Sequence, residues 1–113
     1  MRSEKLTECE AQVMKVIWES EKELSMMEIW KRANAKYNYA WAPQTVSSFL
    51  ERLRRKEFIK YYRVGRLFYY EVLVSYEEYR RQMVKDFIGF WFCGSDDETI
   101  FDEVKLVLQD LRH

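Results

Sequence analysis

The sequence is short of the residues that break secondary structure and of those that most often do chemistry. Its 113 residues include three glycines, one proline, two cysteines and a single histidine, which is the last residue, His113. So few glycines and prolines, together with a hydrophobic content of 48%, exclude a disordered chain. There is no internal histidine, no glycine-rich phosphate loop and no HExxH motif. We therefore expect a folded protein that is not an enzyme.

The cysteines and the hydrophobic runs exclude further classes of protein. Cys9 and Cys93 are far apart and show no CxxC spacing, which predicts reduced thiols and no metal site. The longest apolar run, residues 87–93, is too short to cross a bilayer, and the first residues show no signal peptide. We expect a cytoplasmic protein with no cofactor and no membrane partner.

Charge is balanced over the whole chain but not along it. Residues 1–74 contain fourteen basic and ten acidic residues, whereas residues 75–113 contain five and nine. Between Lys31 and Arg66, ten basic residues are opposed by two acidic ones, Glu51 and Glu57. A local excess of this kind often accompanies nucleic-acid binding.

Four Ser/Thr-x-x-Glu boxes predict the beginnings of helices, because the hydroxyl and the carboxylate can each bond a free amide of the first turn. These boxes begin at Thr7, Ser25, Ser75 and Ser95. The first two predict helices over residues 8–20 and 26–36, with Leu24 as a short extended link between them. Helical spacing places Met27 on the buried side of the second helix.

A third helix and a β-hairpin are predicted next. Pro43 suits the first position of a helix, and residues 43–56 have apolar side chains at helical spacing. Two runs rich in β-branched and aromatic residues, 58–64 and 67–72, lie on either side of Gly65, which can adopt the positive φ of a tight hairpin. Three helices followed by a hairpin are the order of a winged helix-turn-helix domain, a mainly α fold with one small β-hairpin.

Two further amphipathic helices are predicted after the hairpin. The first is apolar on nearly all sides at its end, and the second begins near Asp96. Because such faces need a partner, we expect residues 75–113 to form a helical dimerisation region after a winged-helix domain in residues 1–74. The residues expected at the dimer interface are Tyr79, Met83, Phe87, Phe90, Trp91, Ile100, Val104 and Leu108. The alternative for this aromatic stripe is a ligand pocket in a regulator that senses a small molecule.

The outward face of the third helix carries side chains suited to DNA. Small donors and acceptors suit base edges in the major groove, and arginines suit phosphates. The expected base readers are Gln44, Thr45, Ser47 and Ser48. The side chains expected at the DNA backbone are Trp41, Arg52, Arg55, Lys60, Arg63 and Arg66. Two alternatives stay open: Trp41 can instead close the preceding turn over the core, and a winged helix can bind protein and not DNA.

Several motifs, in order and at matching spacing, resemble those of the penicillinase-repressor family. Residues 6–18 resemble its opening helix, and residues 41–53, WAPQTVSSFLERL, resemble its recognition helix. Residues 65–70 resemble its wing, and residues 74–79 resemble the start of its dimer domain. The resemblance covers about residues 6–92.

The resemblance implies a homodimeric transcriptional repressor that binds a palindromic operator in double-stranded DNA. The third helix would enter the major groove, and the hairpin would lie on the backbone as a wing. The resemblance also implies a regulatory protease that cleaves the C-terminal region when a membrane sensor detects a β-lactam. Copper-responsive members carry a C-terminal CxC cluster, which this chain lacks.

Four features depart from the family pattern. Ala42 stands where the family has a serine cap, which predicts a weaker start for the third helix. Glu57 replaces the glycine of a Lys-Gly-Leu motif, so we expect a different exit from that helix. Val72 replaces a common proline after the wing. The stretch between the last two helices is nearly absent after Gly94, which affects the dimer geometry and the cleavage site.

Overall fold

The structure is a computed structural model that describes residues 5–112. Its contacts group into two compact units, Met1–Glu78 and Tyr79–His113. In the first unit the indole N–H of Trp18 donates to the carbonyl of Val74 at 2.9 Å, and the Trp18 ring lies 5.3 Å from that of Tyr76. The two units divide after Glu78, within the helix Tyr76–Trp91. The domain boundary expected at residue 74 stays a prediction.

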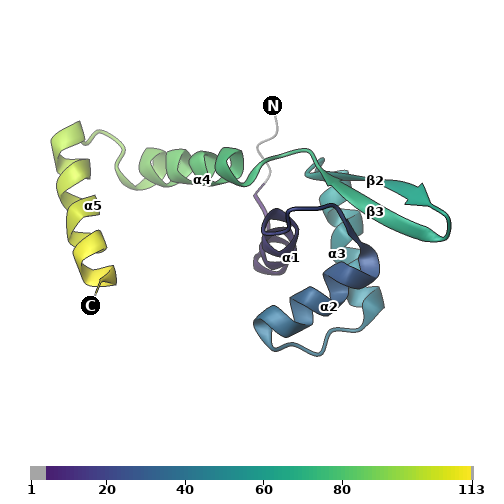
Figure 1. Cartoon of the computed structure of the whole chain (residues 1–113). Coiled ribbons are helices and arrows are strands. Elements are labelled where there is room, and N and C mark those ends of the chain that lie inside the picture. The colour runs from purple at the N-terminus through teal and green to yellow at the C-terminus, as the bar shows by residue number, and fades with distance from the viewer. Residues whose placement is uncertain (1–4, 113) are drawn as a thin grey trace. The chain divides into compact units, whose positions relative to one another are not determined.

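Three helices make up the helical part of the first unit: α1 (Glu8–Trp18), α2 (Met26–Tyr37) and α3 (Pro43–Arg55) (Figure 1). Their mutual contacts bury the apolar side chains that the helical spacing predicted. These include Val13, Met14, Ile29, Ala33, Val46, Leu50 and Leu53. The prediction for Met27 was wrong, since this side chain is 40% exposed. It lies two residues before Ile29, which places it on the opposite side of α2.

The hairpin consists of β2 (Ile59–Val64) and β3 (Leu67–Val72), which pair in antiparallel orientation. A third strand, β1 (Leu24–Ser25), pairs with the other edge of β3, so the sheet order is β1-β3-β2. The sequence predicted an extended link at Leu24 but not its pairing, because two residues are too few to show a strand pattern. Gly65 has a φ of +63° in the turn, as expected.

Helix beginnings follow the predicted capping boxes in three of four cases. The confirmed boxes begin at Thr7, Ser25 and Ser75, where each hydroxyl accepts an amide and each glutamate returns to the cap amide. The fourth box was wrong, because α5 (Asp97–Leu111) is capped by Asp96, whose carboxylate accepts from the amide of Thr99 at 2.9 Å. Aspartate caps a helix as well as serine does, so it displaces Ser95 by one position.

One ion pair is built into the core of the first unit. Glu10, which is 1% exposed, accepts at 2.7 Å from the ammonium group of Lys56, which also donates to the carbonyl of Lys5. Burial raises the pKa of Glu10, but its bonds with Lys56 and Thr7 more than offset this and hold the pKa below its ordinary value. One carboxylate thus joins the beginning of α1 to the residue that caps the end of α3.

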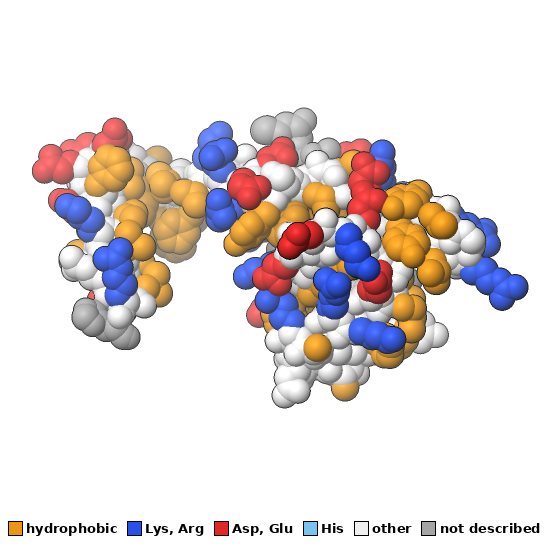
Figure 2. All heavy atoms as spheres, in the orientation of Figure 1, with side chains coloured by type: hydrophobic (Ala, Val, Ile, Leu, Met, Phe, Trp, Pro, Cys, Tyr) orange, Lys and Arg blue, Asp and Glu red, His pale blue; other side chains and the backbone are white. Residues whose placement is uncertain are grey.

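The second unit contains most of α4 (Tyr76–Trp91) and all of α5, and neither helix has a buried residue. Hydrophobic side chains are visible on both helices in Figure 2. Those more than half exposed include Phe87, Phe90, Trp91, Phe101 and Leu111. No helix in the described part of the chain is long and apolar enough to span a membrane. Because hydrophobic side chains of α4 and α5 are exposed, the apolar faces of these helices are uncovered in a single copy. Dimerisation through these faces stays a prediction.

Candidate nucleic-acid interface

The exposed side of α3 is set by its three fully buried residues, Val46, Leu50 and Leu53. Because a helix turns by about 100° per residue, the positions farthest from these three form one stripe. This outer stripe consists of Gln44, Ser48, Arg52 and Arg55, with the half-buried Glu51 at its edge on the side of the wing. Ser47 and Arg54 lie farther toward the wing, and Thr45 lies on the other side. Thr45 is half-buried, so it is the least accessible of the four expected base readers.

The turn before α3 is held by the backbone of Trp41. Its carbonyl accepts from the indole N–H of Trp30 at 2.6 Å and from the side-chain amide of Asn34 at 3.0 Å, and its N–H donates to the same Asn34. The Trp41 ring lies 5.2 Å from the ring of Phe49 in α3. This geometry favours the alternative in which Trp41 closes the turn over the core, and its contact with DNA stays a prediction.

One face of the hairpin is turned toward α3. Strand alternation and register place Tyr61, Arg63, Phe68 and Tyr70 on this face. The Tyr61 and Phe68 rings meet edge to face at 5.3 Å. Arg63 lies over the Phe68 ring at 5.8 Å, and its Nε donates to the carbonyl of Gly65 at 2.9 Å. Arg63 is therefore held on the same side of the hairpin as the rings that face α3.

The opposite face of the hairpin carries Lys60, one of the residues expected at the DNA backbone. The Lys60 ammonium group lies 3.7 Å from the carboxylate of Glu71, and the stacked rings of Tyr62 and Tyr69 lie beside this pair. The structure thus separates Lys60 from the face turned toward α3. Arg66 is exposed in the turn, and basic side chains are visible at the tip of the hairpin in Figure 2.

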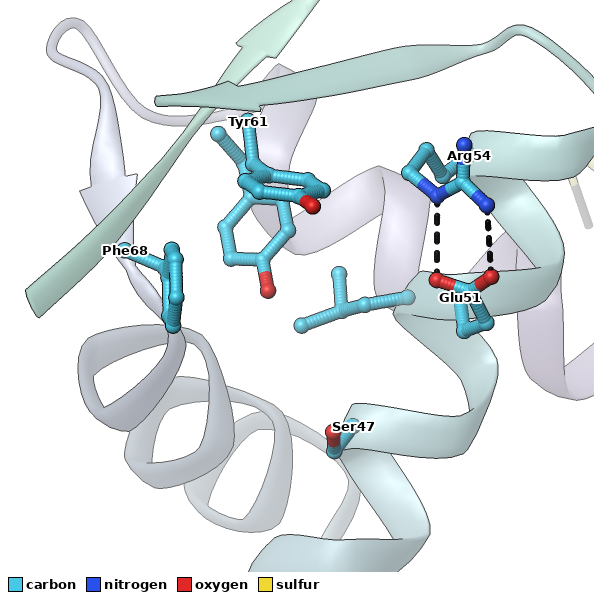
Figure 3. Close-up of a pocket in the computed structure, with 7 residues that line it drawn as sticks. Ser47, Glu51, Arg54, Tyr61 and Phe68 are labelled. Atoms are coloured by element: carbon cyan, nitrogen blue, oxygen red, sulfur yellow. Dashed lines mark hydrogen bonds and ion pairs between the residues drawn. The ribbon is translucent and has the colours of Figure 1, made fainter. Parts of the chain in front are cut away.

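Two shallow hollows lie on either side of Glu51. The first, of about 200 Å³, lies between α3 and the hairpin (Figure 3). It is lined by Ser47, Leu50, Glu51, Arg54, Tyr61, Phe68 and Tyr70. The second, of about 340 Å³, follows the exposed side of α3 and is lined by Ser47, Ser48, Glu51, Arg52 and Arg55. Two expected base readers and two residues expected at the DNA backbone therefore share one surface.

The comparisons with known proteins agree with this geometry. The family model described as penicillinase repressor matches residues 6–106. The chain belongs to the penicillinase repressor family. This repressor is also similar to the solution structure of the DNA-binding domain of the repressor BlaI, with a TM-score of 0.58 and 28% identity over 66% of this chain and 88% of the other. A search of curated proteins finds no match.

Family membership confirms several expectations for this repressor. The resemblance read from its motifs, the winged-helix fold and the regulatory, non-enzymatic class are all confirmed. The class is that of DNA-binding transcriptional repressors. The roles of individual residues, the dimer, the operator and the protease stay predictions.

The helix α3 of this repressor begins without a side-chain cap, as the alanine at position 42 predicted. Ala42 already has the φ of −73° and ψ of 155° that suit a capping serine. We expect Ala42→Ser to raise the free energy of unfolding by about 1 kcal/mol, because the new hydroxyl would satisfy a free amide of the first turn. Urea titration measures this gain. Ala40→Ser, the same change at an exposed position outside the helix, is the control, and an equal gain there would contradict the capping argument.

Glu57 ends α3 of the repressor in a conformation that favours glycine. Its φ is +64°, its N–H donates to the carbonyl of Arg54, and the N–H of Phe58 donates to the carbonyl of Leu53. These two bonds form a Schellman motif, whose left-handed position is most often glycine. The helix exit thus has a left-handed conformation that favours glycine, with a residue that is strained there. Whether this exit differs from that of the family stays a prediction.

Replacing Glu57 by glycine should therefore raise the free energy of unfolding of the repressor by about 1 kcal/mol. The gain comes from relief of the close approach between Cβ and the backbone at positive φ. Thermal and urea unfolding measure it. Glu57→Gln keeps the strain and removes only the charge, so this control should leave stability unchanged; a gain as large in the glutamine variant would assign the effect to charge.

The sequence-based prediction missed one pair of residues in the repressor's interface. The Glu51 carboxylate accepts from Nε and Nη2 of Arg54 at 3.0 and 2.7 Å, and from Nε of Arg55 at 3.3 Å. The bond with Arg54 is the main reason that the pKa of Glu51 falls to about 2, so Glu51 is ionised at neutral pH. Helical spacing alone puts Arg54 at the edge of the outward face, but the i,i+3 spacing of an acid and a base could have indicated the pair.

Proposed function

We propose that this protein is a homodimeric repressor that binds a palindromic operator in duplex DNA. In each copy, α3 enters the major groove and the hairpin lies along the neighbouring backbone as a wing. The observation that supports this most is the shared surface of α3 and the hairpin, where the serines and arginines of α3 lie on the side that Arg63 also faces. An α-helix with small polar side chains fits the width of the major groove.

The basic side chains of this surface supply the affinity. Arg52 lies over the ring of Phe49 at 5.5 Å, which holds its guanidinium group at the exposed edge of α3. Arg63 and Arg66 are exposed as well, whereas the exposed Arg55 donates from its Nε to the carboxylate of Glu51 at 3.3 Å. Each arginine that neutralises a phosphate releases condensed counterions, so the affinity should fall steeply as salt rises.

The exposed apolar faces of α4 and α5 support the homodimer. Side chains such as Phe90 and Trp91, 74% and 67% exposed in one copy, would be costly to leave in water. A palindromic site needs two copies of α3 about one DNA turn apart, and a two-fold dimer supplies two symmetry-related copies.

Proteolytic inactivation is the part of the proposal that rests on family membership. The segment between α4 and α5 supports it in this chain, because residues 93–96 are exposed and lie outside both helices. Cleavage there would separate α5 from the rest of the chain. The dimer would then lose the apolar face of α5, and the operator would be released.

Arginine substitutions test the DNA-binding surface directly. Arg52→Ala and Arg63→Ala should each weaken binding to operator duplex about tenfold. Each should also reduce the slope of log affinity against log salt concentration by about one for each phosphate that is no longer neutralised. Fluorescence anisotropy at several salt concentrations measures both quantities. Lys85→Ala, at an exposed position on α4, should leave both unchanged. Full affinity in both arginine variants would contradict the proposed surface.

A further inference from the structure

Glu51 occupies an unusual place for an acidic residue in a helix that approaches DNA. It is the only acidic residue in α3, and it lies half-buried at the wing-side edge of the outward face, between Ser48 and Arg55 along the helix. Both hollows of the surface include it in their lining. A carboxylate in a groove between two rows of phosphates is repelled by them, whatever the base sequence. Its presence there needs a compensating interaction.

Part of that compensation comes from the helix itself. Arg54 donates two hydrogen bonds to the carboxylate, of 2.7 and 3.0 Å, which are drawn in Figure 3. Arg55 donates a third hydrogen bond of 3.3 Å. The geometry orients the carboxylate and also engages two guanidinium groups that would otherwise be free to bind phosphates. Glu51 therefore lowers the sequence-independent attraction of α3 for any duplex.

A base of the DNA can supply a further partner. An ionised carboxylate can only accept hydrogen bonds, so in the major groove it needs an amino group as its partner. The N4 amino group of cytosine is the donor that glutamate side chains contact there. Opposite a base that presents a carbonyl oxygen, the same carboxylate would be desolvated against another acceptor.

We propose that Glu51 is a specificity-determining residue that accepts a hydrogen bond from the N4 amino group of a cytosine in each operator half-site. On any other duplex it holds Arg54 and Arg55 away from the phosphates and so disfavours binding. This inference rests on the proposed function, since it requires α3 to lie in the major groove. It adds Glu51 to the serines as a reader of bases, with Arg54 and Arg55 as positioning residues.

The test compares Glu51→Ala with the wild-type chain on two probes: a duplex from the region upstream of the protein's own coding sequence, and an unrelated duplex of equal length. We expect affinity for the upstream duplex to fall about tenfold, because alanine cannot accept the hydrogen bond from the base. We expect the affinity for the unrelated duplex to rise. The factor by which this affinity falls between 50 and 200 mM salt should grow about threefold for each arginine that becomes free to bind a phosphate. The two affinities should thus move in opposite directions.

Glu19→Ala is the matched control. Glu19 is an exposed carboxylate paired with Lys36 at 3.0 Å, so its replacement removes the same charge from a surface that is not expected to touch DNA. Both duplexes should then respond equally. A second readout replaces each C·G pair of the upstream duplex in turn: one position per half-site should matter to the wild type and not to Glu51→Ala.

The outcomes separate this inference from the proposed function. If the wild type binds no duplex at 50 mM salt, the proposed function fails and the inference fails with it. If the wild type prefers the upstream duplex but Glu51→Ala shifts both affinities in the same direction, the inference alone is overturned. Opposite shifts, together with the loss of one cytosine preference, establish it.

Discussion

Replacing Lys56 by methionine should lower the free energy of unfolding by about 3 kcal/mol at pH 7. Methionine keeps the length and the apolar stem of the side chain but leaves the Glu10 carboxylate without its cation. Glu10 is 1% exposed, and breaking a buried pair on one side leaves an uncompensated charge. Urea titration at constant temperature measures the loss.

The effect of Lys56→Met should depend on pH. In the wild type the pKa of Glu10 lies below its ordinary value of 4.5, so the stability that this carboxylate contributes is present above that value and is lost as the pH falls through the lowered pKa. In the variant the buried carboxylate has no cation, so its pKa should rise and protonation should relieve the penalty. The stability difference between the two proteins should therefore shrink between pH 7 and pH 4.

Glu10→Gln supplies the control for this ion pair. Glutamine can still accept from the Thr7 amide at the third position of a capping box, so the helix start is kept while the charge is removed. Combining Glu10→Gln with Lys56→Met should restore part of the stability lost in Lys56→Met alone, because no buried charge remains. A double variant that is less stable than either single variant would contradict the account, as would a loss of equal size at both pH values.

Replacing Phe90 and Trp91 together by glutamate should convert the proposed dimer to a monomer and weaken binding to the upstream duplex by at least about a hundredfold. Both side chains are largely exposed in one copy, so their loss removes nothing from the core of that copy. Charges placed on an apolar interface, however, would have to be desolvated on association. A dimer gains affinity by binding two half-sites at once, and a monomer loses that gain.

Sedimentation velocity and anisotropy measure the two effects. The control introduces the same change in net charge with one substitution, Lys85→Glu, at an exposed position on the polar side of α4. This control should remain dimeric and bind as the wild type does. The dimerisation proposal fails if the wild type sediments as a monomer, or if the double variant remains a dimer.

Much of the fold could be predicted because local patterns and packing agree. Each of the first three helices begins where a cap or a proline marks it, and the predicted bounds of α1, α2, α3 and the hairpin strands lie within two residues of those in the structure. The buried residues Val46, Leu50 and Leu53 follow from spacing alone, since an amphipathic helix needs only its own sequence to define its inner face.

Two of the misses depend on an interaction or a competition that a single motif does not contain, and the third is a side chain that lies off the helical period. The strand β1 exists because β3 offers it an edge. Asp96 takes the cap of α5 from Ser95 because two good caps stand next to each other. Met27 does not lie at helical spacing from the buried residue Ile29, and its side chain is exposed. A hydrophobic residue near the beginning of a helix therefore need not face the core.

The candidate site was predicted in its composition but not in its arrangement. Side-chain type and helical spacing indicated Ser47, Ser48 and Arg55. The ion pairs of Glu51, the placement of Lys60 on the far face of the hairpin and the packing of Trp41 on Phe49 depend on side-chain geometry. The ion pairs join the carboxylate of Glu51 to Arg54 and Arg55, and this carboxylate lies in the lining of both hollows.

The central claim, that α3 and the hairpin form a surface for duplex DNA, is tested most directly by a fluorescence anisotropy titration of the full chain. The labelled duplex carries the region upstream of the protein's coding sequence, and an unlabelled duplex of shuffled sequence serves as competitor. We predict saturable binding at 50 mM salt that the shuffled duplex displaces poorly and that weakens by at least about a hundredfold at 200 mM salt. No binding at 50 mM salt, or binding that the shuffled duplex displaces as well as the upstream duplex does, would contradict this claim.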